Sequence, residues 1–423
     1  GDLYGRKLVL QWAIGVFILG AVLCGTAQNM WMVIGGRIIQ GCGGGALIVT
    51  SMAVVGDLLP ARERGQAQAV LGAAFGISTV IGPLLGGFLV QNLSWHWIFF
   101  VNFPVGLAAF IVLSQALPRR SDRRRKSVDY AGGALLATLL ASLVLISNTG
   151  GTVFAWSSPQ LLLLAVIALS ALALFIRVER RAEEPILPMS LFANNTFVVV
   201  NFVGILVGMG MFGTITFLPF FLQVVKGVSP TTSGLFLVPM MGGLLTASIA
   251  SGRYMARSGR YKLLPVLSTA LLAVAMLSMT TLSVDSPLWL IALSMIGIGL
   301  GIGPVYSIGV AAIQNAIPVS MLGVGTASAN MFRLIGGAVG TAGFGALFST
   351  GVARNLAGQL PQAAEGGIRN IGAEMVNALP PEARLQVMEG ISHALHPVFW
   401  IAAAAAVLAC LASIMLRELP LSG

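Results

Sequence analysis

The amino-acid sequence predicts an all-α protein that crosses a membrane many times. Only 9% of its 423 residues are charged and 57% are hydrophobic, and the mean hydropathy is +0.91. Soluble domains, by contrast, carry about 25% charged residues. Apolar runs of about 20 residues, the length of a membrane-spanning helix, recur along the whole chain. They do not alternate apolar and polar residues as the strands of a membrane β-barrel do, so helices are expected.

Twelve such runs are expected to span the membrane. In order, they cover residues 8–26, 31–55, 66–90, 97–117, 131–149, 159–176, 197–222, 232–252, 263–282, 287–313, 325–349 and 397–416. The stretch between the last two, 351–396, is expected to be a long outer loop, acting as a spacer or carrying a short helix on the membrane surface.

The basic residues predict the orientation of these spans. Eighteen of the 24 Lys and Arg residues lie in residues 1–7, in the tail and in every second loop. By the positive-inside rule these segments are cytoplasmic, so both ends of the chain are expected in the cytoplasm and the protein in the inner membrane. The formal charge of +10 is therefore explained by the basic cytoplasmic loops. The basic run 119–126 gives no reason to expect nucleic acid as a partner.

An internal repeat predicts the domain organisation. A shift of 258 residues aligns the second predicted span with the tenth and pairs Gly41 with Gly299, Gly43 with Gly301, Gly45 with Gly303, Pro60 with Pro318 and Gly65 with Gly323. Transporters are often built from two such repeats. Two six-helix halves joined directly would place equivalent spans six apart rather than eight, so two inserted helices are expected between the halves.

Three parts follow from this count. Residues 1–117 are expected to hold four of the six helices of an N-terminal bundle, residues 118–196 a linker with the two inserted helices, and residues 197–423 a C-terminal six-helix bundle. The first bundle would be completed by two further spans before Gly1, which predicts a parent protein of fourteen spans.

Four motifs in order carry a resemblance to a known family. They are GDLYGRK at the start, RIIQGCGGGA from Arg37, GISTVIGPLLGG from Gly76 and SWHWIFFVNFPVG from Ser94. With them the chain resembles the major facilitator superfamily, and within it the fourteen-span drug:proton antiporters of the EmrB/QacA type. The resemblance implies two pseudo-symmetric helical bundles that export small molecules by alternating access.

The opening motif predicts a conformational latch. Asp2, Gly5, Arg6 and Lys7 place an acid and two cations on a tight cytoplasmic turn, where Asp2 can face a helix N-terminus and Arg6 a carboxylate. The alternative is a positive-inside anchor with a helix cap. The corresponding SGRYMARSGRYK of the second half has Ala256 in place of the acid, so a latch there would be weaker.

Two arginines lie inside predicted spans. Arg37, with Gln40 one turn later on the same helix face, lies where a cation costs about 2.5 kcal/mol or more unless it is paired or reaches water. The resemblance implies a role in proton coupling for Arg37. Arg333 invites the same hypothesis, although its side chain could also extend to the cytoplasmic interface.

Two further groups of residues are candidates for function. Gly76, Gly82, Pro83, Gly86 and Gly87 give one helix a bare face and a kink, which physics alone explains as packing and the resemblance as an antiporter signature. A wall of flexible and aromatic side chains with a few polar atoms suits lipophilic ligands, although packing against lipid or core explains each residue singly. The candidates for such a substrate cavity are Asn201, Met209, Phe212, Phe217 and Asn330.

No acidic residue lies convincingly inside an apolar span. The resemblance implies a proton-binding Asp in the first helix of the family, so the proton site is expected in the stretch before Gly1. We therefore expect a proton-coupled antiporter of lipophilic drugs or other small molecules. A lipid or siderophore exporter is the close alternative, and a non-transporting membrane sensor is the alternative of another class.

The expected partners are a lipophilic substrate, protons and the bilayer, and a monomer is compatible with the sequence. No enzymatic motif is present, and the three cysteines lack the spacing of a metal site, so neither a metal nor a cofactor is expected.

Overall fold

The computed structural model describes residues 5–117, 129–151, 153–183, 185–355, 376 and 379–419. Within these residues the structure is helical, apart from turns and one isolated bridge between Gly150 and Phe154. The all-α prediction is confirmed.

Every predicted span coincides with one helix or with two consecutive helices. They are α1 (Arg6–Gly25), α2 (Met30–Leu58), α3 (Ala61–Asn92), α4 (Trp97–Phe100) with α5 (Asn102–Ala116), α6 (Tyr130–Thr149), α7 (Pro159–Glu179), α8 (Asn195–Val224), α9 (Pro230–Leu235) with α10 (Leu237–Ser258), α11 (Leu263–Met279), α12 (Leu288–Ala316), α13 (Leu322–Asn355) and α16 (Pro381–Ile414). Short 3₁₀ helices precede α8 and α13, as η1 (Met189–Ala193) and η2 (Val319–Met321). In the part of the chain that the structure describes, ten helical segments are long and apolar enough to cross a membrane, two fewer than the twelve predicted spans. The two others are α3, which is not among the ten, and α11, a shorter apolar helix of 17 residues.

Polar residues fix the starts of several helices. The side chain of Asn29 accepts a hydrogen bond from the Met32 backbone N–H, and Asp129 does the same for Gly132. Ser158, Asn194 and Ser229 cap α7, α8 and α9 in this way. Such caps satisfy backbone N–H groups that the first turn of a helix leaves without partners.

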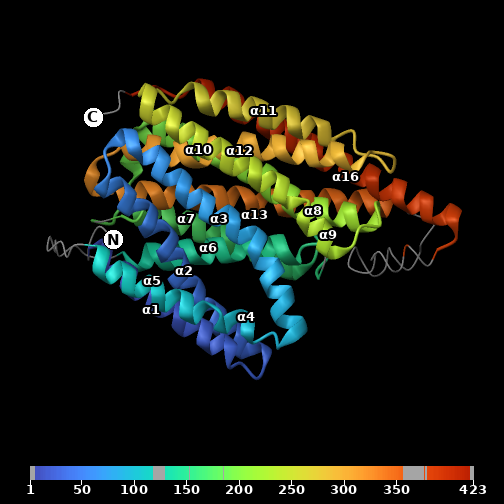
Figure 1. Ribbon diagram of the computed structural model, residues 1–423, viewed down its shortest axis with the longest axis horizontal. Helices are drawn as coiled ribbons and strands as arrows, with labels where there is room; N and C mark the ends of the chain where they lie inside the picture. Colours follow the sequence, from blue (N-terminus) through green and yellow to red (C-terminus); the bar gives the residue numbers. More distant parts are fainter. Residues whose placement is uncertain are drawn as a thin grey trace.

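The helices lie roughly side by side along the length of the molecule (Figure 1). Helices α1, α2, α4 and α5 form one group, while α8, α10, α11, α12, α13 and α16 form a second, which holds the main buried apolar cluster. Helix α3 packs mainly against α10 and α12 and thereby joins the groups. We call α1–α5 the N-terminal half and α8–α16 the C-terminal half.

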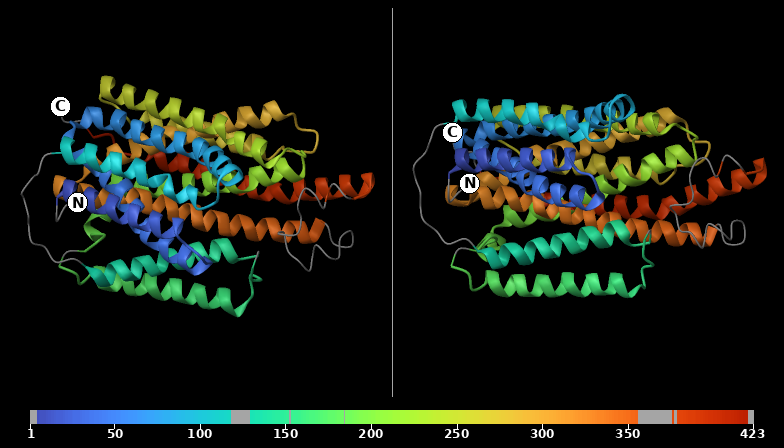
Figure 2. Two further views of the ribbon diagram at one scale, coloured as in Figure 1. Left: turned by 60° about the horizontal axis from the view of Figure 1, so that its bottom comes forward. Right: turned by 90° about the horizontal axis from the view of Figure 1, so that it is seen from below.

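Helices α6 and α7 form an antiparallel pair at the side of the molecule (Figure 2). They pack on each other through Leu139, Ala168 and Ala171, and α6 also contacts α13. This is the position in the chain where the sequence places two inserted helices.

One packing contact recurs in both halves. A Cβ atom on Gly43 of α2 would lie 2.5 Å from the Phe17 nitrogen of α1, and one on Gly301 of α12 would lie 2.6 Å from Leu272 of α11. Gly43 and Gly301 are a pair of the 258-residue repeat, and each allows its helix to approach the equivalent neighbour closely. The contact supports the repeat.

The predicted loop 351–396 differs from the structure at both ends. Helix α13 continues to Asn355, and residues 381–396 are the first half of the continuous helix α16, whose start extends past the other helices (Figure 1). The expectation of a spacer is wrong for these residues, because Pro380 and Pro381 occupy the start of a helix, where proline is tolerated. The remainder of the predicted loop, apart from residues 376 and 379, lies outside the described residues.

Candidate functional site

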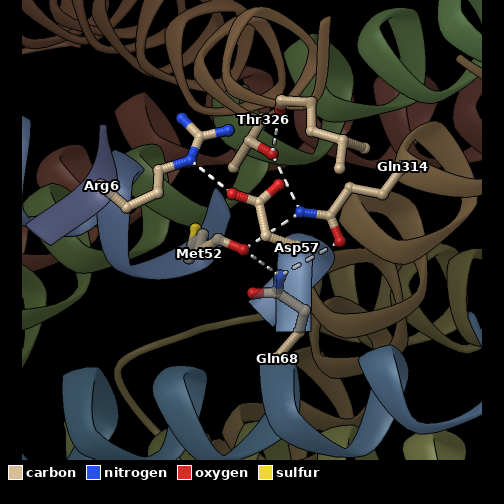
Figure 3. A network of polar contacts seen from close by, with 7 residues as sticks. Arg6, Met52, Asp57, Gln68, Gln314 and Thr326 are labelled. Atoms are coloured by element: carbon tan, nitrogen blue, oxygen red, sulfur yellow. Dashed lines mark hydrogen bonds and ion pairs between the residues drawn. The ribbon is translucent and has the colours of Figure 1, made fainter. Parts of the chain in front are cut away.

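Polar contacts between helices concentrate at one end of the bundle. At this end α1 and α3 begin, α2 and α12 end, and the side chains of Arg6, Asp57, Gln68 and Gln314 come together (Figure 3). We call it the Arg6 end. Helix α8 also begins here, since the Asn194 side chain donates to the Ala316 carbonyl at the end of α12, 2.8 Å away.

An ion pair joins the start of α1 to the end of α2. Arg6 Nε donates to Asp57 Oδ2 at 2.7 Å, and the two side chains are only 14% and 21% exposed (Figure 3). Gly5, directly before α1, has a φ of 85°, a left-handed conformation that glycine adopts at little cost. This turn precedes the helix that carries Arg6. Arg6 thus faces a carboxylate, and the role of the motif as a conformational latch stays a prediction.

Lys7 and Gln11 secure the same end of α1 to α5. Lys7 Nζ donates to the carbonyl oxygens of Ser114 and Leu117 at 2.6 and 2.7 Å, and Gln11 Nε2 donates to Ser114 Oγ at 2.8 Å. Lys7 thus completes the last turn of α5, where carbonyl groups lack partners within the helix. Asp2 lies outside the described residues.

A second set of contacts connects the two halves. Gln314 Nε2, on α12, donates to the Met52 carbonyl of α2 at 3.1 Å and to Thr326 Oγ1 of α13 at 3.0 Å. Gln68 Nε2, on α3, donates to the same Met52 carbonyl at 2.9 Å (Figure 3). Arg64 donates to the Gln314 carbonyl at 3.1 Å. We call Met52, Arg64, Gln68, Gln314 and Thr326 the cross-bundle network.

Three side chains of the network are buried, so water cannot replace a hydrogen bond that they lose. Gln314 is 2% exposed, Gln68 3% and Thr326 fully buried. A buried amide that loses its partner costs about 1–3 kcal/mol. These contacts therefore favour the conformation in which the two halves meet at the Arg6 end.

The backbones of α3 and α10 also meet at this end. A Cβ atom on Gly252 would lie 2.7 Å from the Gly65 carbonyl oxygen and 2.8 Å from the Gln66 Cα atom. Because both are backbone atoms, a larger residue would force the helices apart.

The second half has no equivalent acid at the position of Asp57. At the 258-residue repeat shift Asp57 corresponds to Asn315, and Arg260 is exposed. In the second half, an amide side chain therefore occupies the position of the acid that forms the ion pair in the first half.

The two intramembrane arginines have different surroundings. Arg37, on α2, is exposed; it donates to Gln40 Oε1 at 3.3 Å and lies 5.0 Å from the centre of the Phe99 ring. Arg333, on α13, is 7% exposed, donates to Asn330 Oδ1, and stacks its guanidinium 3.6 Å from the centre of the Tyr306 ring. A role in proton coupling stays a prediction for both.

The antiporter-motif glycines lie in α3 on the side away from the Arg6 end. A Cβ atom on Gly82 or Gly86 would meet no described atom within 4 Å. Gly76, Pro83 and Gly87 are also within the helix, and their surroundings are not among the described features. The proposed role of this surface remains a prediction.

The predicted cavity residues take part in packing on α8 and α13. A Cβ atom on Gly340 of α13 would lie 2.7 Å from Met209, and Phe212 contacts Gly337 in the same seam. Phe217 is 8% exposed and packs edge-on against Phe348, with ring centres 5.6 Å apart.

The two asparagines of the predicted cavity differ. Asn201 is 4% exposed, and its Oδ1 atom has no hydrogen-bond partner among the described residues. Asn330 contacts the Met52 sulfur across the halves at 3.3 Å and so lies beside the cross-bundle network. The structure brings Asn330 together with Arg333 but places Met209, Phe212 and Phe217 in the α8–α13 seam and the core.

At the opposite end of the bundle, Lys226 follows α8 and donates to the Val284 carbonyl. Burial lowers the pKa of Lys226, and the Asp285 carboxylate partly offsets this effect. His396 contacts the Leu282 carbonyl at 2.7 Å. These contacts join elements of the C-terminal half to each other.

Sequence reasoning missed most of the cross-bundle network. Asp57 and Gln314 lie just after the predicted spans 31–55 and 287–313, and the sequence alone indicates no partner for either. The available signal was a polar side chain near the same end of each of four apolar spans: Asp57, Gln68, Gln314 and Thr326.

These helices are those of a polytopic membrane protein, by their length and composition. The model of the Major Facilitator Superfamily matches residues 1–341, and the chain belongs to this superfamily. Its members transport solutes and are not enzymes.

Several relatives cover much of the chain, and the names of two of them concern multidrug resistance or multidrug transport. Multidrug resistance protein 3 of Bacillus subtilis is 31% identical over 421 residues, which are 96% of this chain and 82% of that protein. The multidrug transporter protein MdtP of the same species is 39% identical over 350 residues, covering 82% and 64%. An MFS-type transporter of Mycobacterium tuberculosis is 38% identical over 422 residues, and the chain spans 61% of its length.

Solved structures share the fold. The human organic anion transporter MFSD10 aligns with a TM-score of 0.61 at 14% identity, covering 96% of this chain and 78% of that one. A bacterial homologue of the iron transporter ferroportin, in an outward-facing state, aligns with a TM-score of 0.59 at 12% identity, covering 98% and 84%.

Proposed function

We propose that the protein exports lipophilic compounds across the cytoplasmic membrane in exchange for protons, by alternating access. The observation that carries the proposal is the set of polar contacts that join the two halves at the Arg6 end. The Gln314 bond to Met52 and the Arg64 bond to the Gln314 carbonyl connect helices of both halves, and Asp57 pairs with Arg6 next to them.

The mechanism requires these contacts to form in one state and break in another. A ligand shifts a conformational equilibrium only through its different affinity for the two states. In our proposal the cross-bundle network and the Arg6–Asp57 pair stabilise the state closed at the Arg6 end. Substrate and proton then act by changing the balance between this state and one in which the halves separate there.

The charge distribution supports placing the Arg6 end in the cytoplasm. Segments at this end carry Arg6, Lys7, Arg64 and Arg260, as the positive-inside rule expects of cytoplasmic loops. The described conformation would then be closed toward the cytoplasm. Helix α1 begins and helix α16 ends at the same end of the bundle, which agrees with two cytoplasmic ends (Figure 1).

The relatives support the substrate class and the sequence motifs support the exchange. The names of the Bacillus subtilis relatives state multidrug transport for one and multidrug resistance for the other. The antiporter-type motif from Gly76 supports exchange over one-way transport. The fourteen-span subtype, the division into 1–117, 118–196 and 197–423, and the site roles of Arg37 and Gln40 belong to the same proposal.

Efflux driven by a proton gradient tests this proposal. We expect the protein in its natural full length, reconstituted in liposomes, to transport ethidium when a pH gradient is imposed. Dissipating the gradient with nigericin in potassium buffer should abolish net transport. Transport that persists at the same rate without a gradient would contradict proton coupling, and no transport of ethidium or other lipophilic dyes would contradict the export function.

A further inference from the structure

We propose that Arg333, held by Tyr306 and Asn330, binds the acidic group of an anionic lipophilic substrate. The inference rests on the proposed export function and assigns it a substrate class. The ligand is a compound with an apolar body and a carboxylate or sulfonate group.

The side chain of Arg333 is oriented by three helices. Its guanidinium carbon lies 3.6 Å from the centre of the Tyr306 ring on α12, and it donates to Asn330 Oδ1 one turn earlier on α13. The Tyr306 hydroxyl contacts the Met211 sulfur of α8 at 3.2 Å, which fixes the ring. A guanidinium stacked on an aromatic face keeps its N–H groups directed outward in its own plane.

This cation has no counter-charge among the residues that the structure describes. Arg333 is the one buried basic side chain among the described residues, and it makes no ion pair with a described carboxylate. An unpaired charge in a membrane interior is costly. Arg333 has five N–H donors, of which Asn330 accepts from one, and such a planar group can donate two parallel hydrogen bonds to the oxygens of a carboxylate or a similar oxyanion.

The position of Arg333 is that of a ligand group rather than a surface anchor. Met52 and Thr326 of the cross-bundle network contact Asn330, and Arg333 follows three residues later on the same face of α13. Going from the Arg6 end inward, the order on α13 is therefore Thr326, Asn330 and Arg333. An anion bound to Arg333 would lie directly beyond the contacts that close the Arg6 end.

The other described intramembrane arginine does not offer such a site. Arg37 is exposed and contacts Gln40 and Phe99 of the N-terminal half. Burial, a stacked ring and an unmatched charge occur together at Arg333.

A matched pair of probes tests the subsite. Naphthaleneacetate and naphthaleneacetamide have nearly the same shape, but only the first is an anion at neutral pH. In a scintillation proximity assay with tritiated probes and the purified full-length protein, we expect naphthaleneacetate to bind at least about tenfold more tightly, as a charge-assisted pair requires.

Three variants test whether Arg333 causes this preference for the anionic probe. Arg333→Met should remove the preference and leave naphthaleneacetamide affinity within about twofold. Arg333→Lys should keep part of it, because an ammonium group retains the charge but loses the planar fork. Arg354→Met changes an exposed arginine on the same helix and should leave the preference unchanged.

Equal binding of both probes by the unchanged protein would overturn the inference, as would a full preference in Arg333→Met. If Arg333→Met does not give a monodisperse protein in size-exclusion chromatography, Arg333→Lys decides the question. An anion preference unchanged in Arg333→Lys would then overturn the inference, and a reduced one would support it.

Ethidium transport separates this inference from the proposed function. Proton-driven ethidium efflux without an Arg333-dependent anion preference would refute the subsite and leave the export function intact. An Arg333-dependent preference in a protein that transports no lipophilic dye would refute the export function and leave the anion subsite intact.

Discussion

Replacing Asp57 with Asn is expected to lower the rate of proton-driven efflux at least about tenfold. The Asp57 carboxylate accepts a 2.7 Å hydrogen bond from Arg6, and both side chains are largely shielded from water. A hydrogen bond to a charged group contributes about 1.5–3 kcal/mol, and about 1.4 kcal/mol is a factor of ten in an equilibrium. Initial rates of ethidium transport in proteoliposomes measure the effect.

The partner residue provides the control for this prediction. Arg6→Ala should impair transport by a similar factor, and Asp57→Asn combined with Arg6→Ala should be no worse than either alone, because contacting residues are not additive. A normal rate in Asp57→Asn would show that the pair is a static anchor. Fully additive losses would show that the two residues do not act through their ion pair.

Replacing Gly252 with Leu is expected to abolish efflux without preventing folding. Any side chain at this position must meet the backbone of Gly65 and Gln66, where a Cβ atom already lies within 2.8 Å. Backbone atoms cannot rotate away as a flexible side chain can, so α3 and α10 must separate at the Arg6 end. Transport rate, together with size-exclusion chromatography for folding, measures the result.

The same helix offers a matched control. A Cβ atom on Gly242 of α10 would meet no described atom within 4 Å, so Gly242→Leu should retain nearly normal transport. Equal transport by Gly252→Leu and Gly242→Leu would contradict the claim that close approach of α3 and α10 is needed for the transport cycle.

Much of the fold could be predicted from hydropathy, because a span must satisfy its backbone hydrogen bonds internally and so becomes a helix. The predicted span 131–149, for example, corresponds to α6 (Tyr130–Thr149). The start of α16 at Pro381 was not predicted, since its first turns mix polar and apolar residues and lie beyond the apolar run. Hydropathy locates the apolar part of a helix, not its full length.

Less of the candidate site could be predicted. A basic residue on a tight turn indicated that Arg6 would face a carboxylate, but the sequence contains no rule that selects Asp57, 51 residues away. Gln68 and Gln314 are 246 residues apart and meet only because α3 and α12 pack together. Such partners depend on the tertiary arrangement of whole helices, which local patterns do not encode.

The separation of the two halves at the Arg6 end is the most direct test of alternating access. Leu58, at the end of α2, and Val319, in η2 between α12 and α13, belong to different halves and are 50% and 71% exposed. Neither side chain makes a described polar contact that a spin label on Cys at these positions would remove. In double electron–electron resonance of the full-length protein in liposomes, we expect a short-distance population that matches the described conformation and a longer one, with a ratio that changes when substrate or pH is varied. A single distance distribution that stays unchanged while the labelled protein transports substrate would contradict the account.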